Sequence, residues 1–141
     1  MTQTTDPEGL LYHIEHQVWA RPDADGLFTV GITGLGVRLS GEIYMCRPKG
    51  VGVVVEQGRS IGVVELAKSI VSVRSPLSGE VVEVNPRLRA EPELVHRFPY
   101  GEGWLARIRP SALEHERAAL LSGADVAPAM REHARLHRIE I

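Results

Sequence analysis

Short runs of β-branched residues, each bounded by glycine or proline, dominate the hydrophobic pattern up to about residue 110. Such residues favour strands, and glycine and proline mark the turns between them. Many short strands with frequent glycine turns indicate a sandwich or a flattened barrel. The predicted strands are 29–32, 43–46, 51–55 and 81–84, with two more that contain Val63-Val64 and Ile70-Val71.

After Pro110 the pattern changes to helical spacing. Ser111 and Glu114 have the spacing of a capping box, which predicts a helix that ends at Gly123. A second helix is predicted to begin near Asp125. Each helix is expected to pack one apolar face on the sheet. The residues on these faces are Leu113, Leu120 and Leu121 in the first helix, and Met130 and Leu136 in the second.

Lys68 lies between two glycine-marked strand segments: Gly58 is ten positions before it, Pro76 eight after it and Gly79 eleven after it. The flanking strands would place its amine at the tip of a hairpin, although the turn lacks the Asn-Gly or Asp-Gly of a two-residue type I′ turn. Lysines are ordinarily protonated at neutral pH, so an enzyme that modifies one amine must select it by its presentation on a rigid turn. A lysine that only solubilises a loop is the alternative, but Lys49 and Lys68 are the chain's only lysines.

This frame around Lys68 resembles the lipoyl-lysine segment of lipoyl domains. Biotinyl domains share that architecture, but biotin acceptors usually carry Met on both sides of the lysine. Here the neighbours are Ala67 and Ser69. The resemblance therefore implies lipoate as the attached group, with a biotinyl carrier as the remote alternative.

A longer resemblance, from Tyr12 to about Arg109, is to the H protein of the glycine cleavage system. The Pro99-Tyr-Gly-Glu-Gly-Trp104 run separates H-type carriers from the plain lipoyl domains of 2-oxoacid dehydrogenase subunits. The other landmarks follow in order along the chain. They are Glu15-His-Gln-Val-Trp19, Thr29-Val-Gly-Ile-Thr33, Gly41 with Tyr44, Glu65, the segment 75–85, and Pro92-Glu-Leu-Val95.

The resemblance implies a β-rich α+β fold, a lipoyl-domain-type barrel-sandwich hybrid in which a flattened barrel of short strands carries added short helices and a helical C-terminus. It implies an N-terminal tail over residues 1–11, a lipoyl-carrier domain over 12–110, and a helical segment over 111–141 that packs on this domain. Tyr100 and Trp104 are expected to be core anchors, with a lining of the cleft beside the arm as the alternative.

The resemblance further implies that lipoate is joined to Lys68 by an amide and serves as a swinging arm whose ring opens to two thiols on reduction. Glu65, Ala67 and Ser69 surround the attachment turn and are expected to be recognised by the ligase or by partners. For Glu65, an ordinary solvated carboxylate is the alternative. Lipoate ligase or lipoyl-assembly enzymes are the first partners that the resemblance implies.

Several positions depart from the H-protein pattern. His16 is one residue farther from Trp19 than in the usual His-x-Trp, Leu66-Ala67 replaces Ser-Val, and His96 stands where Asn is customary. The segments 39–43 and 48–52 look more like lipoate-binding proteins of bacterial and archaeal sulfur oxidation.

These departures favour a carrier that works with a heterodisulfide-reductase-like sulfur-oxidising complex and sulfur transferases. The alternative is a genuine H protein that carries an aminomethyl group. Its partners would be glycine decarboxylase, aminomethyltransferase and dihydrolipoyl dehydrogenase. In either case a monomer is expected, because a buried hairpin tip could not visit other active sites.

Composition excludes several other classes of protein. The 141 residues suit one domain with a modest core, and a net charge of −2 with dispersed positive residues argues against nucleic-acid binding. Residues 1–9 contain no basic region or apolar run, so neither a secretory signal nor a membrane span is expected, and a cytoplasmic location is predicted. Cys46 is the only cysteine, which excludes an internal disulfide and predicts a small buried residue on a strand.

The remaining candidate chemistry is weak. His133 and His137 have the i, i+4 spacing of a helical metal pair, but no zincin glutamate lies between them and no third ligand is obvious, so solvated surface histidines are predicted. Gly34 and Gly36 lack the third glycine of a nucleotide loop. No nucleophile elbow, Cys-His or paired-carboxylate pattern is present, so the chain is predicted to be a carrier and not an enzyme.

Overall fold

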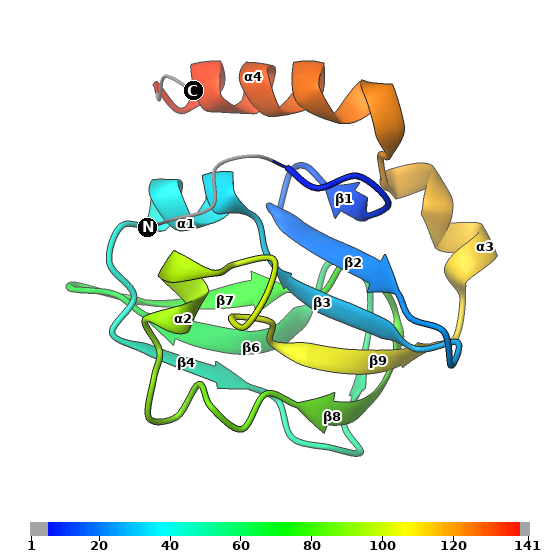
Figure 1. The fold of residues 1–141 in the computed structure, drawn as a ribbon, viewed down its shortest axis with the longest axis horizontal. Helices are drawn as coiled ribbons and strands as arrows, with labels where there is room; N and C mark the ends of the chain where they lie inside the picture. Colours follow the sequence, from blue (N-terminus) through cyan, green and yellow to red (C-terminus); the bar gives the residue numbers. More distant parts are fainter. Residues whose placement is uncertain (1–5, 139–141) are drawn as a thin grey trace.

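Nine strands and four α-helices lie within residues 6–138, the part of the chain that this computed structural model describes (Figure 1). The strands are β1 (Leu11–His13), β2 (Val18–Pro22), β3 (Phe28–Ile32), β4 (Met45–Pro48), β5 (Val54–Val55), β6 (Ser60–Glu65), β7 (Ile70–Arg74), β8 (Gly79–Val84) and β9 (Ala106–Pro110). The α-helices are α1 (Gly34–Ser40), α2 (Leu94–Arg97), α3 (Leu113–Glu116) and α4 (Val126–Leu136). Two 3₁₀ turns, η1 (Arg117–Ala119) and η2 (Gly123–Asp125), connect α3 to α4.

The strands form two antiparallel sheets. The larger sheet has the order β1-β2-β3-β9-β8-β5, and the smaller sheet has the order β4-β6-β7. This arrangement confirms the predicted β-rich fold with short helices and a helical C-terminal part. The barrel is not closed, however, because no strand within residues 6–138 pairs across the two sheets, and β4 and β7 remain edges of the smaller sheet.

The main hydrophobic core joins inward-facing side chains of both sheets. In β3 and β9 alternate residues point inward, which places Val30 and Ile108 in the core. In β6 a register shift between Ser60 and Gly62 interrupts the alternation, and both Ile61 and Val64 join the same core. Burial of these residues between the sheets provides the largest favourable contribution to folding.

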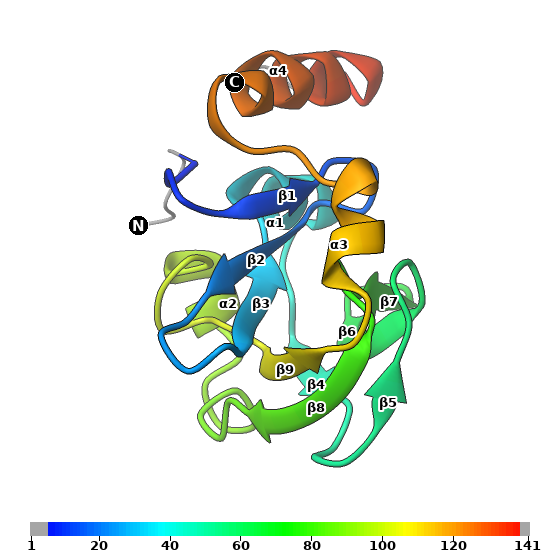
Figure 2. The same ribbon diagram turned by 90° about the vertical axis from the view of Figure 1, so that its right-hand side faces the viewer.

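A second hydrophobic cluster lies between α4 and the larger sheet, where Trp19 of β2 and Tyr12 of β1 pack with Met130. Figure 2 shows α4 lying across β1, with α3 at the side of the molecule. Met130 is buried as predicted, whereas the prediction for Leu136 is wrong because its side chain is 63% exposed beyond this cluster. None of the helices within residues 6–138 combines the length and the apolar character needed to span a bilayer.

Three of the predicted elements differ from the observed ones. The strand expected over 43–46 is observed as β4, which begins at Met45 and ends at Pro48. The strand expected over 51–55 is reduced to Val54–Val55, because Gly52 has a φ of 92° and the Val53 N–H donates to the Gly50 carbonyl in a turn. The helix expected from Ser111 to Gly123 consists only of α3 and η1, and its N-cap is Ala112, which makes no side-chain capping bond.

The segment after η1 leaves the helical conformation because it pairs with β1. Leu121 and Tyr12 exchange two backbone hydrogen bonds of 2.9 and 2.8 Å as an isolated bridge. Leu120 is buried, and Leu113 and Leu121 are half-buried against the cores, as the predicted apolar face requires. The proposed division of the chain at residues 11 and 110 stays a prediction.

Candidate functional site

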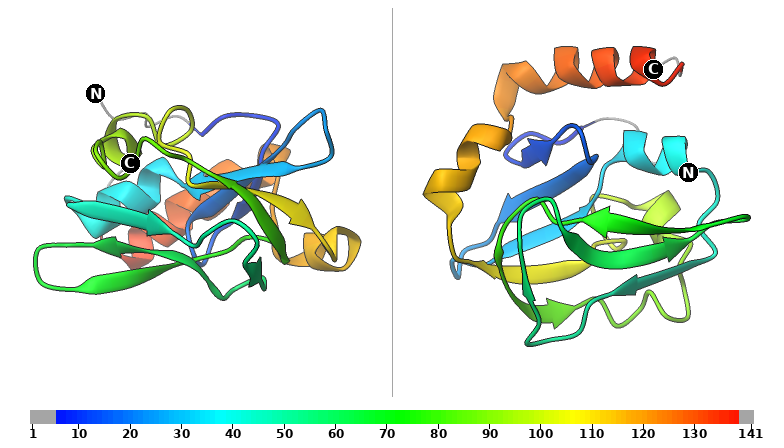
Figure 3. Two further views of the ribbon diagram at one scale, coloured as in Figure 1. Left: turned by 90° about the horizontal axis from the view of Figure 1, so that it is seen from below. Right: turned by 180° about the vertical axis from the view of Figure 1, so that it is seen from behind.

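The hairpin of β6 and β7 presents Lys68 at its tip. The strands pair in register through Val64 with Val71 and Glu65 with Ile70, and the Leu66 N–H then donates to the Ser69 carbonyl at 2.8 Å. This bond closes the loop 66–69, which projects from the rest of the molecule as the green loop in Figure 3. The strands end at Glu65 and begin again at Ile70, and the bond between Leu66 and Ser69 encloses Ala67 and Lys68 at the tip.

The side chains around the tip are open to solvent. Ala67, Lys68 and Ser69 are exposed, and Glu65 is half-buried. No hydrogen bond or ion pair within residues 6–138 engages the Lys68 side chain, and none joins it to Glu65. The amine is thus accessible to a modifying enzyme without the loss of an existing interaction.

The base of the hairpin is held by a short hydrogen-bond network. The Gly58 N–H donates to the Ser75 carbonyl at 2.9 Å, and the Ser75 N–H donates to the Arg59 carbonyl at 2.7 Å. Gly79 begins β8 in close contact with β9, since an added Cβ would lie 2.1 Å from the Arg109 carbonyl oxygen. These contacts give a structural reason for the glycine-marked frame that surrounds Lys68 in the sequence.

Glu116 strengthens this base from α3. Its carboxylate is buried and accepts hydrogen bonds from the Ser78 N–H, at 2.8 Å, and from the Ser78 hydroxyl. The Glu116 carbonyl also accepts a bond from Gln57 Nε2 at 3.2 Å. This contact was not predictable from the sequence, because it joins residues 38 positions apart in the chain.

A cleft of about 360 Å³ lies beside the hairpin. One wall is mainly apolar and comes from the inner face of the hairpin and from α1. The other wall is polar and comes from the connection between β1 and β2 and from the end of α4. The first wall includes Val64, Leu66, Val71, Ser72, Val73, Gly36, Leu39 and Ser40, and the second includes Glu15, His16, Gln17, His133 and His137. A cleft of this size suits a small ligand with an apolar stem and a polar end.

Each histidine that lines the cleft stacks on another histidine, and His13, the partner of His16, lies outside the lining. The rings of His133 and His137 lie 4.3 Å apart between centroids, and those of His13 and His16 lie 4.5 Å apart. Burial and the neighbouring His137 lower the pKa of His133, while Glu15 acts to raise it. Burial and His16 likewise lower the pKa of His13, so these two imidazoles favour the neutral form at neutral pH.

The prediction of solvated histidines is only partly correct. His137 is exposed, but His133 is half-buried, and both line the cleft. Within residues 6–138, no group of three or more His, Cys, Asp or Glu side chains is arranged to hold a metal ion. Cys46 is buried on β4 as predicted, and burial raises the pKa of its thiol to about 12, which makes it unreactive.

Tyr100 and Trp104 pack with the second cluster and do not line the cleft. Tyr100 is buried, donates its hydroxyl hydrogen to Asp6 at 2.6 Å and accepts from the Gly34 N–H at 2.9 Å. Trp104 is half-buried against the same cluster. The predicted core-anchor role is therefore confirmed for Tyr100, whereas Trp104 packs at the edge of the cluster.

His96, one of the departures from the H-protein pattern, has a structural role. Its Nε2 accepts a hydrogen bond of 2.6 Å from the backbone N–H of Ile43. This bond ties α2 to the segment between α1 and β4. Because Nε2 accepts, the ring carries its proton on Nδ1 when neutral.

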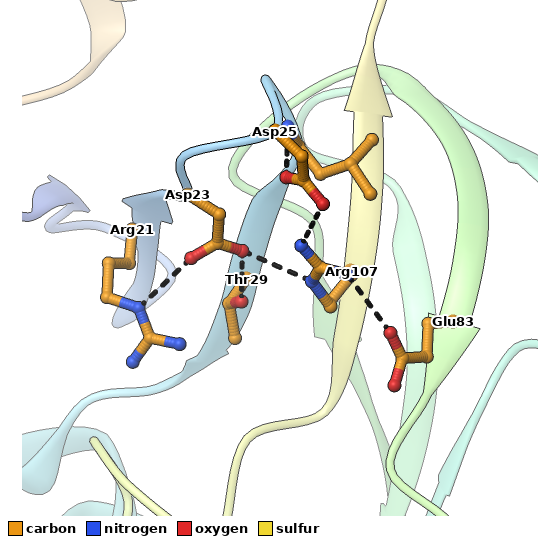
Figure 4. A network of polar contacts seen from close by, with 7 residues as sticks. Arg21, Asp23, Asp25, Thr29, Glu83 and Arg107 are labelled. Atoms are coloured by element: carbon orange, nitrogen blue, oxygen red, sulfur yellow. Dashed lines mark hydrogen bonds and ion pairs between the residues drawn. The ribbon is translucent and has the colours of Figure 1, made fainter.

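A polar network braces the larger sheet at the turn between β2 and β3 (Figure 4). The Arg107 guanidinium donates to Asp25 at 2.7 Å, to Glu83 at 3.1 Å and to Asp23 at 3.2 Å. Arg21 and Thr29 also donate to Asp23. In Figure 1 this turn lies at the opposite end of the molecule from the hairpin tip, so the network is a brace and not part of the cleft.

Comparison with known proteins agrees with this geometry. The family model described as "Glycine cleavage H-protein" matches residues 10–133. Glycine cleavage system H protein 2 of Aquifex aeolicus is 37% identical over 127 residues, which cover 90% of this chain and 79% of that protein. The H protein of Cronobacter sakazakii is 42% identical over 118 residues, covering 84% and 90%.

A crystal structure of a glycine cleavage system H protein from Mycobacterium marinum superimposes with a TM-score of 0.74 at 30% identity. The match covers 95% of this chain and all of the other. The residues matched by the family model include the whole hairpin of β6 and β7. The chain belongs to the glycine cleavage H-protein family.

Proposed function

We propose that this chain is a lipoyl carrier, with lipoate joined by an amide to Lys68. The observation that carries the proposal is the exposed, unpaired Lys68 side chain at the closed tip of a hairpin. The family assignment supports the same function, since a carrier protein needs one accessible amine for its cofactor and no set of catalytic side chains. The chain carries a group between enzymes and does not itself catalyse a reaction, and a cytoplasmic location and a monomeric state belong to the same proposal.

The neighbouring cleft suits the arm in length and character. An extended lipoyl-lysine spans roughly 14 Å from Cα to its first sulfur, at about 1.2 Å for each of a dozen bonds. Val71 lies three residues beyond Lys68, or about 10 Å along a strand, so the arm reaches the cleft. The apolar hairpin wall can pack on the methylene chain while the polar wall meets the sulfur end.

We propose that the cargo is the aminomethyl group of glycine cleavage. The prediction of sulfur oxidation is not supported by the relatives, which are named as glycine cleavage system H proteins, and the alternative fits them better. The polar wall is compatible with an ammonium cargo, because Glu15 supplies a carboxylate and His133 a hydrogen-bond acceptor in its neutral form.

The proposed partners follow from this cargo. They are glycine decarboxylase, aminomethyltransferase and dihydrolipoyl dehydrogenase, together with a lipoate ligase or lipoyl-assembly enzyme. Glu65, Ala67 and Ser69 surround the amine and are the first residues that such a ligase would contact. Glu65 is the strongest of the three for recognition, since it presents a charge at the last paired position of β6.

The attachment site is tested by the intact mass of the protein after expression with a lipoate ligase. The wild-type chain and the Lys49→Arg control are expected to gain one lipoyl increment, and Lys68→Arg is expected to gain none while it keeps its circular dichroism spectrum. Lys49 is a matched control because it is the only other lysine and is also exposed. A lipoyl increment on Lys68→Arg would show that another residue carries the group.

The cargo is tested by reconstitution. The lipoylated chain, as sole carrier, is expected to support glycine-dependent release of carbon dioxide by glycine decarboxylase. No release here, together with efficient oxidation of bound sulfur by a heterodisulfide-reductase-like complex, would return the sulfur pathway to first place and leave the role of Lys68 intact.

A further inference from the structure

We propose that His133, in the last turn of α4, and His137, at its C-cap, accept a proton from a thiol of the reduced lipoyl arm when the arm lies in the cleft. The inference rests on the proposed function, because it requires a lipoyl group on Lys68. It assigns a chemical role to a histidine pair that the sequence predicted to be only solvated. The role adds a proton acceptor to a protein that otherwise serves as a support for the arm.

The placement of the pair is the first argument. His133 and His137 line the same cleft as Leu66 and Val71 of the hairpin, although they lie more than 60 positions away in the chain. In Figures 1 and 3 the C-terminal end of α4 and the hairpin tip lie on the same side of the molecule. The match to the family ends at residue 133. It therefore does not include the end of α4 or His137.

The orientation of the two rings is the second argument. His137 Nδ1 lies 2.9 Å from the His133 carbonyl oxygen, which fixes its proton on Nδ1 and leaves Nε2 as an acceptor. His133 stacks on this ring at 4.3 Å between centroids. Stacking holds both imidazoles at the cleft without occupying them in an ion pair, so an acceptor nitrogen is available to a ligand.

The charges at the cleft act on the proton acceptor in opposite directions. Among the described residues that line it, the titratable groups are Glu15, His16, His133 and His137. Burial and His137 lower the pKa of His133, which keeps its imidazole neutral and open to a proton but makes it a weaker base. Glu15 has the opposite effect on His133, so its carboxylate stabilises the imidazolium once it has formed. His16 directly follows Glu15 in the chain, and its ring stacks on His13.

The chemical step is a proton transfer without a redox change. The S–H bond of one dihydrolipoyl thiol breaks, its proton binds the imidazole nitrogen, and a thiolate–imidazolium pair results. The thiolate is the reactive form in thiol–disulfide exchange and in transfer to carbon. A thiol of ordinary pKa near 8.5 is only about 3% thiolate at pH 7, so a neighbouring imidazole changes the reactive fraction substantially.

The experiment measures how fast iodoacetamide alkylates the reduced, lipoylated protein at a series of pH values, with adducts read by mass. The variants are His133→Gln, His137→Gln and the double variant, and His115→Gln on α3 is the matched control because His115 is exposed and does not line the cleft. Free dihydrolipoamide gives the unperturbed profile. Cys46 does not interfere, because it is buried.

In the wild type and the His115→Gln control, the midpoint of alkylation is expected about one pH unit below that of free dihydrolipoamide. The double variant is expected to return to the free profile, with a rate at pH 7 about threefold lower than wild type, since a lower thiol pKa also reduces intrinsic nucleophilicity. The single variants show which imidazole contributes more. His137→Gln is expected to fold like the wild type, since the His137 side chain is exposed and is not part of a core.

Identical profiles for lipoylated wild type, double variant and dihydrolipoamide would overturn the inference while leaving the carrier function in place. A wild-type protein without a lipoyl increment at Lys68 would overturn the proposed function and, with it, this inference. The two failures are distinguished by the mass of the protein before reduction.

Discussion

Side chains are held in different ways in two regions of the molecule. One region is the body, which is the larger sheet with its helices, and the other is the hairpin of β6 and β7. In the body, Trp19 is fully buried and its Nε1 donates to the carbonyls of Ile32 and Pro99, each at 3.1 Å. In the hairpin, Ile70 is 67% exposed and Val71 is 44% exposed. Apolar surface is thus covered in one region and left in solvent in the other.

This difference indicates where the free energy of folding is concentrated. Contacts near Trp19 join β2, β3, the turn after α2 and α4, whereas the hairpin beyond Val64 is held mainly by its own ladder of backbone bonds. Exposed β-branched side chains beside Lys68 are therefore available to partners, and their cost in stability is small. The body can be expected to tolerate few changes and the hairpin many.

The largest expected effect is that of Trp19→Ala. Removing this side chain leaves a cavity and two unpaired carbonyls, which should lower the free energy of unfolding by about 3–5 kcal/mol. The matched change in the hairpin, Ile70→Ala, should alter it by less than about 0.5 kcal/mol. Urea denaturation followed by circular dichroism measures both. Similar losses in the two variants would contradict the contrast between body and hairpin.

Gly79→Ala should have the next largest effect, because it tests the junction where the hairpin segment returns to the body. The new methyl group would lie 2.1 Å from the Arg109 carbonyl oxygen, so β8 and β9 must separate, at a cost of about 1–3 kcal/mol. Gly50→Ala is the control, since an added Cβ there meets nothing within 4 Å. Midpoints of urea unfolding should fall for the first variant only; an unchanged midpoint for Gly79→Ala would show that the two strands move apart easily.

His96→Ala sharpens the comparison at the link between the body and the smaller sheet. It removes the acceptor of the Ile43 N–H and should cost about 1–2 kcal/mol, because a backbone donor is left unpaired. His96→Gln keeps an acceptor and should lose less than half as much. If thermal unfolding gave equal losses for the two variants, packing of the ring and not its hydrogen bond would be the stabilising feature.

Arg107→Gln should have the smallest effect, one that depends on pH. The pKa of Asp25 is lowered mainly by its hydrogen bond from Arg107. At Asp23 burial acts to raise the pKa, but hydrogen bonds from Thr29, Arg107 and Arg21 outweigh burial, and the pKa is lowered. Carboxylates with lowered pKa values stabilise the fold above about pH 4, and this contribution disappears as pH falls through the folded-state values. The variant should therefore lose less than about 1 kcal/mol at pH 7.

The same variant should differ little from wild type at a pH of about 2, where both aspartates are protonated. Urea unfolding at the two pH values checks this, with Arg89→Gln as the control, since Arg89 has no ion pair within residues 6–138. A loss that is the same at both pH values would indicate packing of the Arg107 stem instead of its charge.

The sequence predicted those parts of the fold that depend on local preference. β3, β6, β7 and β8 lie where β-branched runs placed them, and Lys68 is at a hairpin tip because its loop is closed by neighbours in the chain. The helix after Ser111 failed, because the contact of Glu116 with Ser78 and the pairing of Leu121 with Tyr12 override the helical pattern. Propensity is a weak guide where distant contacts compete with it.

The cleft was not predictable in the same way. Its walls come from residues 15–18, 36–40, 64–73 and 133–137, which converge only when α4 packs on β1 and the hairpin folds back over the core. Glu15 and His16 belong to a recognised sequence landmark, but nothing in their spacing brings them to His133. The spacing of His133 and His137 did predict that both rings share one face of a helix, and the structure adds what that face meets.

The backbone bridge between Tyr12 and Leu121 has a consequence for synthesis on the ribosome. The outer edge of β1 is translated early, yet the residue that pairs with it emerges only after the whole hairpin and both sheets have been made. During that interval Tyr12 and Trp19 lack the cover that Met130 provides, so the nascent chain leaves an aromatic surface exposed to solvent. The Lys68 tip, by contrast, can form as soon as residue 74 has left the exit tunnel, which makes modification before chain release physically possible.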